Sequence, residues 1–327
     1  GADQPVPIAS VAKAVTALAV LQKMPLAPGD QGPLFTVTAA DVALYENYVA
    51  KNGSVVRVAL GDQLTQRQML EAMLLPSGNN IADSLAIWAF GSLENYRTYA
   101  NAMVAEIGMT HTIIGSDASG YAPDTTSTPS DLVLLAHAAI TQPTIASIVG
   151  QSSAVLPTIG TITNTNSLLD SHGVIGIKTG TSAQAGACLL FAATYVVHEG
   201  QTITLVGTVL GATNRSDALA KSASLIDSAA HGFSYETPIH KGDAIATYQL
   251  PWGGEVVAVA KDDISFTRWQ SDTVQIRVAP ATLNQSVQKD AQLGTLTVTA
   301  GDKTFTVPLV AAAEVADPSL LWRLLRH

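Results

Sequence analysis

Three short motifs in a fixed order constrain this chain more than any other feature of its sequence. They are S-x-x-K at residues 10–13, S-x-N at residues 77–79 and K-T-G at residues 178–180. Each motif alone recurs by chance, so the weight comes from order, spacing and local context. The apolar stretch that follows Ser10 predicts the start of a buried helix. Because helical residues three apart share a face, we expect Lys13 to stand beside Ser10.

This pairing suits nucleophilic catalysis. A serine hydroxyl is a poor nucleophile until a neighbouring base takes its proton. A lysine can act as that base when burial and a second cation disfavour its charged form. We therefore assign Ser10 as nucleophile, Lys13 as general base and Lys178 as the second cation. The alternative for Ser10 and Lys13 is an ordinary helix cap with a surface lysine.

The S-x-N motif is expected on a loop. A helical pattern over residues 64–75 ends at proline and glycine, and a second helical run extends to Phe90. In the functional interpretation Ser77 relays a proton toward the leaving amine. Asn79 then holds Lys13 and the peptide carbonyl of the substrate. In the structural interpretation either residue simply caps a helix.

The K-T-G motif is expected to begin an antiparallel set of strands. Residues 187–197 and 202–210 read as buried strands joined by a short polar turn. An open strand edge can pair with an extended peptide, and Gly180 leaves room for its backbone. The amides of Ser10 and Thr181 would then form an oxyanion hole.

The trio and its surroundings resemble the D-alanyl-D-alanine carboxypeptidases, which are low-molecular-mass penicillin-binding proteins with a β-lactamase/transpeptidase-like fold. Residues 108–112, 127–132, 164–169 and 185–189 resemble segments of that family, and the likeness runs through about the first 235 residues. It implies an acyl-serine hydrolase without metal or organic cofactor. The implied partners are peptidoglycan stem peptides and, as covalent inhibitors, β-lactams. The resemblance assigns substrate contacts to Thr179, Gly180, Thr181, Ser182 and Arg215, the last for the terminal carboxylate of the substrate.

Two departures from the family pattern stand out. Thr165 occupies a place where the family often has an arginine, so one cation on the substrate side is missing. Only nine residues precede Ser10, whereas the family has a strand hairpin there. We therefore expect an open sheet edge that a partner molecule, a loop or the C-terminal domain covers.

Length and composition set broader limits. A chain of 327 residues can form two domains, and a net charge of −9 without a basic face argues against a nucleic-acid partner. Cys188 is the only cysteine, and the scattered histidines have no metal-ligand spacing. No apolar run has the length of a membrane span. The peptidoglycan substrate implies a bacterial, extracytoplasmic location in the cell wall or at the membrane.

The pattern along the chain predicts two domains and a tail. Residues 1–234 are expected to form the α/β catalytic domain, with helices around a mostly antiparallel sheet, without its N-terminal strands. Turn signals between short alternating runs predict a small all-β sandwich over residues 235–315. Residues 316–327 combine Trp and Leu with basic residues, as a membrane-proximal anchor or a frayed tail would.

Three other functions compete with the carboxypeptidase. Class A β-lactamases need a loop glutamate for fast deacylation, but no glutamate lies between Glu106 and Glu199. A non-catalytic wall-binding protein of the same fold predicts damage to the trio, which is intact. A D,D-transpeptidase shares the acyl-enzyme and differs only in the acceptor, which the sequence leaves open.

Overall fold

The computed structural model describes residues 3–283, 286–317, 319 and 322. The chain divides into two compact units. Unit 1 comprises Gly1–Tyr195 and Ile203–Ala229, and unit 2 comprises Val196–Thr202 and Ala230–His327. The sequence of each unit accounts for a different architecture.

Helices dominate unit 1, and local signals explain where they begin. Thr65 and Gln68 form a reciprocal capping box, while Thr128 accepts a hydrogen bond from the amide of Asp131 ahead of a helix with proline in its first turn. These helices are the short 3-10 turn η1 (Ala9–Val11), α1 (Ala12–Lys23), α2 (Ala39–Ala50), α3 (Gln66–Leu74), α4 (Asn79–Phe90), α5 (Leu93–Glu106), α6 (Pro129–Thr141), α7 (Pro143–Val149) and α8 (Arg215–Ala230).

One three-stranded sheet and three short two-stranded sheets complete unit 1. The sheet has the order β7-β8-β9, and β7 and β8 are antiparallel from Val174 to Ser182. Its strands are β7 (Val174–Ser182), β8 (Gly186–His198) and β9 (Gln201–Ala212), and the short pairs are β1 (Val6–Pro7) with β4 (Thr126–Ser127), β2 (Leu34–Thr36) with β3 (Gln63–Thr65), and β5 (Ser153–Leu156) with β6 (Gly160–Thr163).

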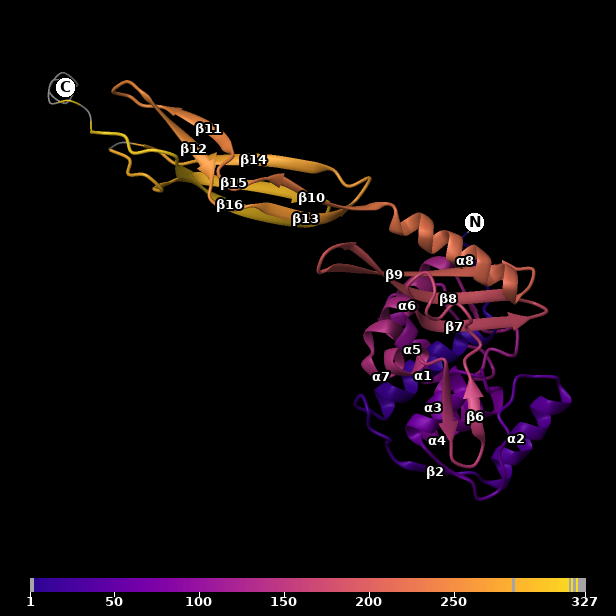
Figure 1. Ribbon diagram of the computed structural model, residues 1–327. Helices are drawn as coiled ribbons and strands as arrows, with labels where there is room; N and C mark the ends of the chain where they lie inside the picture. The colour runs from indigo at the N-terminus through magenta and orange to yellow at the C-terminus, as the bar shows by residue number, and fades with distance from the viewer. Residues whose placement is uncertain (1–2, 284–285, 318, 320–321, 323–327) are drawn as a thin grey trace. The chain divides into compact units, whose positions relative to one another are not determined.

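The sheet separates two helical layers because β8 is apolar on both faces. Cys188 and Leu190 join the large core shared with α1 and α6, whereas Leu189 and Phe191 pack with Ile226 of α8. Figure 1 shows α8 alongside the three strands. Within the described residues, β9 pairs only with β8. Within this part of the chain no further strand pairs with β9, and the cover expected for the open edge, by a partner molecule, a loop or the C-terminal domain, stays a prediction.

Unit 2 is a β domain with its own core. A five-stranded sheet has the order β11-β12-β16-β15-β14, and a second sheet pairs β10 with β13. Alternating residues of both sheets, such as Phe266 and Leu296, fill one apolar cluster, as in a sandwich. The strands are β10 (Phe233–Ile239), β11 (Ala244–Gln249), β12 (Glu255–Ala260), β13 (Ile264–Trp269), β14 (Val274–Pro280), β15 (Gln292–Ala300) and β16 (Lys303–Ala311).

The expected fold class is confirmed: an α/β unit with helices around a mostly antiparallel sheet is followed by a β-sandwich. No single described helix is both long and apolar enough to cross a membrane. Together α6 and α7 meet those criteria by length and composition, but they are bent by 95°. Most of the tail at residues 316–327, expected as a membrane-proximal segment, lies outside the described residues.

Candidate active site

Ser10 lies in a tight turn that leads into α1. Ala9 has a φ of 46°, which a non-glycine residue seldom adopts, and Ser10 follows it within η1. The first turn of α1 places Lys13 beside the serine, and Nζ of Lys13 lies 2.8 Å from Oγ of Ser10. The sequence prediction that these two side chains meet is confirmed.

Lys13 is fully buried and has three hydrogen-bond partners. Besides Ser10, its Nζ contacts Oδ1 of Asn79 at 2.7 Å and the carbonyl oxygen of Ser119 at 3.0 Å. Burial lowers the pKa of Lys13 to about 7, while the negative charges of Asp117 and Asp83 oppose that decrease. Because the two carboxylates limit the decrease, the pKa of Lys13 lies in the range that a general base needs at neutral pH.

The S-x-N motif forms the turn between α3 and α4. Ser77 has a φ of 71°, and Asn79 is the first residue of α4. The backbone amide of Asn79 donates to the carbonyl of Ser54 at 2.8 Å. Asn79 therefore has its backbone fixed by one segment while its side chain holds Lys13 from another.

The K-T-G motif lies on β7, directly against the turn that carries Ser10. A Cβ atom added to Gly180 would lie 3.1 Å from both the carbonyl oxygen of Ile8 and the amide nitrogen of Ser10, which is tighter than ordinary packing. A glycine at this position therefore lets the strand and the turn approach closely.

Lys178 is the second buried lysine of the site. It is 1% exposed, and its Nζ donates to the carbonyl of Thr179 at 3.0 Å. Burial lowers its pKa well below the ordinary value, and the positive charges of Lys13 and Arg215 lower it further. Lys13 thus disfavours the charged form of Lys178, whereas the lowered pKa of Lys13 itself comes from burial. The expected effect of Lys178 on the base stays a prediction.

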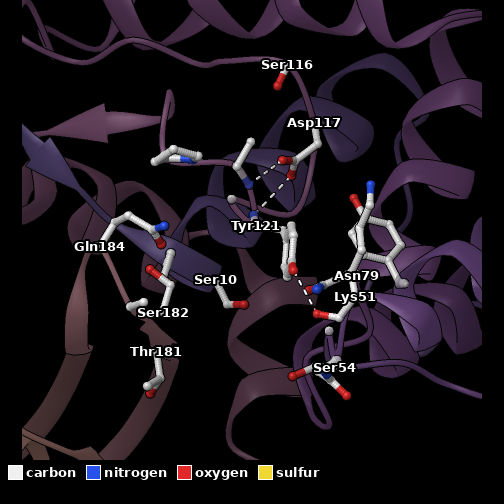
Figure 2. Close-up of a pocket in the computed structure, with 18 residues that line it drawn as sticks. Ser10, Lys51, Ser54, Asn79, Ser116, Asp117, Tyr121, Thr181, Ser182 and Gln184 are labelled. Carbon is white, nitrogen blue, oxygen red and sulfur yellow. Dashed lines mark hydrogen bonds between the residues drawn. The ribbon is translucent and has the colours of Figure 1, made fainter.

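A polar cavity of about 630 Å³ opens beside Ser10 (Figure 2). Four of the predicted residues line it, namely Ser10, Asn79, Thr181 and Ser182. The buried residues Lys13, Ser77, Lys178 and Thr179 lie behind this lining, and neither Gly180 nor Arg215 is part of it. The other lining residues are Ala9, Tyr48, Lys51, Asn52, Gly53, Ser54, Ser116, Asp117, Gly120, Tyr121, Ala122, Pro123, Ala183 and Gln184.

Sequence reasoning missed the loop of residues 116–123, which forms one wall of this cavity. Asp117 closes the loop on itself by accepting from the amides of Ser119, Tyr121 and Ala122 at 2.7–3.2 Å. In Figure 2 the carboxylate of Asp117 turns toward the amides of Tyr121 and Ala122, and Tyr121 reaches across to the carbonyl of Lys51. The run of Ser, Asp and Gly in Ser116-Asp117-Ala118-Ser119-Gly120 is a turn signal that could have revealed the loop.

The residue that replaces the family arginine has a definite role in the structure. The Oγ1 atoms of Thr165 and Thr179 lie 2.6 Å apart, and the amide of Thr165 donates to the carbonyl of Leu75. Thr165 therefore connects the K-T-G strand to the end of α3. Within the described residues, no group of three or more His, Cys, Asp or Glu side chains is arranged to hold a metal ion.

Two sequence profiles match the chain. The profile described as D-alanyl-D-alanine carboxypeptidase matches residues 1–214. The profile described as the C-terminal domain of penicillin-binding protein 5 matches residues 233–317.

Individual relatives give the same result. A D-alanyl-D-alanine carboxypeptidase from Streptomyces sp. is 32% identical over 188 residues, which is 52% of this chain and 62% of that protein. DacA of Escherichia coli is 27% identical and is matched over 98% of this chain and 80% of its own length. The chain thus spans less than two thirds of the first of these relatives.

Solved structures also share the fold. A Streptomyces DD-transpeptidase is 30% identical, with a TM-score of 0.60, and the match covers 69% of this chain and 88% of that one. Penicillin binding protein 5 from Haemophilus influenzae is 20% identical, with a TM-score of 0.64 over 96% of this chain and 92% of that one, and it supports the fold alone.

Proposed function

The chain belongs to the D-alanyl-D-alanine carboxypeptidase family, and on this premise we propose that it removes the terminal D-alanine of peptidoglycan stem pentapeptides through an acyl-enzyme on Ser10. The observation that carries the proposal is the contact of 2.8 Å between Ser10 Oγ and the Nζ of Lys13, whose pKa is lowered to about 7. About half of such amines are neutral near pH 7 and can accept the hydroxyl proton.

Acylation follows from this pair. The proton of Ser10 moves to Lys13, and the serine Oγ forms a bond to the carbonyl carbon of the scissile amide. The oxyanion that develops faces the amides of Ser10 and Thr181. When the C–N bond breaks, the proton passes from Lys13 by way of Ser77 to the nitrogen of the leaving D-alanine.

Substrate binding is assigned to the β7 side of the site. The terminal carboxylate of the substrate is held by Thr179, Thr181 and the positive charge of Arg215, while its backbone runs along Gly180 and Ser182. The Coulomb effect by which Arg215 lowers the pKa of Lys178 supports a positive field from Arg215 at this end of the site. Asn79 lines the cavity and is available to the peptide carbonyl.

Deacylation completes the reaction. Water adds to the ester carbonyl and gives its proton to Lys13. When the bond between the carbonyl carbon and Ser10 Oγ breaks, Lys13 returns a proton to that oxygen, and the shortened peptide leaves. A D,D-transpeptidase differs only because an amine replaces this water. Mass analysis of a pentapeptide substrate separates the two, since loss of one alanine supports hydrolysis and a cross-linked product supports transpeptidation.

Benzylpenicillin tests the nucleophile directly. Opening of its ring by Ser10 releases no leaving group, so the intact protein gains the full mass of the drug. Ser10→Ala should gain nothing. If deacylation is slow, the penicilloyl group stays attached to the protein for minutes or longer. A β-lactamase would return to its original mass within seconds. An unlabelled wild-type protein would overturn the proposal.

The location of the protein is part of the proposal. Peptidoglycan lies outside the bacterial cytoplasm, so an enzyme that trims it acts there. Membrane association through the C-terminal end is supported by the Trp, Leu and basic residues at 318–327. Cosedimentation with anionic vesicles, compared with a variant that ends at residue 317, tests it; equal sedimentation of both forms would reject it.

A further inference from the structure

Asp83 is a buried carboxylate that belongs to none of the three motifs. It lies on α4 one helical turn after Asn79 and is 3% exposed. Its Oδ1 accepts a hydrogen bond of 2.9 Å from the amide of Ala118, and its Oδ2 accepts one of 2.7 Å from the hydroxyl of Tyr48. The side chain therefore connects three separate segments, since α4, α2 and the loop of residues 116–123 meet at one carboxylate.

The amide that Asp83 holds is next to the carbonyl that contacts the base. Ala118 precedes Ser119, and the carbonyl oxygen of Ser119 lies 3.0 Å from Nζ of Lys13. The carbonyl of Ala118 in turn accepts from the hydroxyl of Thr16, three residues after Lys13 on α1, at 2.6 Å. The backbone at Ala118 is thus fixed on its amide side by α4 and on its carbonyl side by α1.

We propose that Asp83 is a positioning residue for Lys13: by holding the amide of Ala118 it aims the carbonyl of Ser119 at the Nζ of the base. This inference rests on the proposed function, because it concerns the base of the same reaction. Asn79 and Asp83 stand one turn apart on α4, so a single helix acts on Lys13 directly through an amide and indirectly through the loop backbone.

The second oxygen of Asp83 extends this support to the cavity wall. Tyr48 donates its hydroxyl to Asp83, and its ring lines the cavity and packs edge-on against Tyr121, with ring centroids 5.5 Å apart. Tyr121 is in the same loop as Ser119. Asp83 therefore fixes both the inner end of the loop, at the base, and the aromatic wall that faces the substrate.

Asp117 differs from Asp83 although both carry charge near the base. The oxygens of Asp117 accept from amides of its own loop, whereas Asp83 accepts from an amide of that loop but lies on a different element, α4. Asp117 gives the loop its shape, and Asp83 sets where the loop lies relative to α1. The two carboxylates thus have separable roles.

The charge of Asp83 gives this role a signature in pH dependence. The charged groups that act on Lys13 are Asp83 from α4 and Asp117 from the loop, and Lys13 in turn lowers the pKa of Lys178 on β7. Burial raises the pKa of Asp83 to about 6, so it is ionised near pH 7 and favours the protonated form of Lys13. Removing only its charge should therefore make Lys13 easier to deprotonate.

The test compares Asp83→Asn and Asp83→Ala in the rate of penicillin acylation from pH 5 to 9. Asparagine keeps an acceptor for the Ala118 amide but loses the charge. We expect its maximal rate within about threefold of wild type and its half-maximal pH lower by roughly one pH unit. Alanine releases the loop, and we expect the maximal rate to fall roughly 10- to 100-fold.

A matched control separates positioning from general stability. Asp131 is also buried, 4% exposed, and accepts from the amide of His111 and the hydroxyl of Thr112, without contact to Lys13 or Ser119. Asp131→Asn should lower the melting temperature and leave the pH profile unchanged. Tyr48→Phe, which removes one donor to Asp83, should reduce the maximal rate less than Asp83→Ala does.

Failure of the positioning role and failure of the proposed function give different results. If wild-type protein forms no penicillin adduct, the proposed function fails before Asp83 is tested. If Asp83→Ala acylates at the wild-type maximal rate, or if Asp83→Asn keeps the wild-type half-maximal pH, the role of Asp83 toward the base is overturned. Should Asp83→Ala not fold, the profile of Asp83→Asn against that of Asp131→Asn still decides the question.

Discussion

Lys13 and Asn79 are joined by a buried hydrogen bond of 2.7 Å between Nζ and Oδ1. The bond connects α1 to the first residue of α4, across 66 positions of sequence. The amide oxygen can accept from the lysine in either protonation state, so it holds the amine in place while the proton moves. Asn79 can therefore hold the Nζ of Lys13 in the same position before and after proton transfer.

The first prediction concerns the pH dependence of acylation. The reactive form of Lys13 is neutral, and the pKa of this amine is about 7. Penicillin acylation should therefore rise with pH and reach half its maximum near pH 7, far below the ordinary titration of lysine. Lys13→Arg, which stays protonated, should lower the rate by roughly 10²- to 10⁴-fold. A rate that continues to climb beyond pH 9 would contradict the assignment.

Stability should also depend on pH through the buried lysines. The pKa of Lys13 is about 7 in the folded protein against 10.5 as its ordinary value, so between these values the unfolded chain binds more protons. The free energy of unfolding should therefore rise from pH 7 to 9, by on the order of 1 kcal/mol per pH unit for each such lysine.

Urea unfolding at pH 7, 8 and 9 measures this slope. The slope should decrease in Lys13→Met and in Lys178→Met, because the pKa of Lys178 is shifted in the same direction. The absolute stability of each variant is immaterial to the comparison. Identical slopes in wild type and both variants would contradict the neutral state of these amines.

Gly120 provides a test of the contact between the loop and the Ser10 turn. It has a φ of 71°, and an added Cβ would lie 2.0 Å from the carbonyl oxygen of Ala9. Gly200 has nearly the same φ, 72°, with nothing within 4 Å of an added Cβ. Gly200→Ala should cost about 1–2 kcal/mol with acylation unchanged, from backbone strain alone.

Gly120→Ala should cost more and slow acylation at least tenfold, because the backbone of the Ser10 turn must move. Thermal melts and intact-mass kinetics of the two variants measure both effects. Equal behaviour of the two alanine variants would indicate that the loop does not constrain the turn.

Thr165 should matter through its contact with Thr179. Thr165→Val removes the hydroxyl that lies 2.6 Å from Oγ1 of Thr179, and leaving that buried hydroxyl unpaired costs about 1–3 kcal/mol. We expect the peptide KM to rise roughly tenfold with a smaller change in kcat. Thr165→Ser keeps the hydroxyl and should restore KM; a serine variant as impaired as the valine variant would argue for a packing effect instead.

The local elements of unit 1 could be predicted from sequence because their signals are local. The strands expected at 187–197 and 202–210 correspond to β8 and β9, and the helical pattern expected over residues 64–75 corresponds to α3. The proximity of Ser10 and Lys13 follows from helical spacing alone.

The supporting residues of the site could not be predicted in this way. Tyr48 and Asp83 are 35 positions apart, and Lys13 and the carbonyl of Ser119 are 106 apart. No periodic pattern links such residues, because their contact depends on how the helices pack. A backbone carbonyl, moreover, carries no residue identity that a sequence motif could record. The contact of Thr165 with Thr179 also depends on packing, between β7 and the end of α3.

The complete burial of Lys13 determines where its proton can go. Its three contacts are Ser10, Asn79 and Ser119, and its side chain has no exposed surface. Neither the amide oxygen nor the carbonyl can carry a proton onward, so in the resting enzyme only the hydroxyl of Ser10 can exchange a proton with Lys13. Acylation removes that route, because the ester oxygen of an acylated serine has no proton to pass. The proposed reaction therefore depends on partners that arrive with the substrate, and an amine sealed from solvent releases its proton only when such a partner is in place.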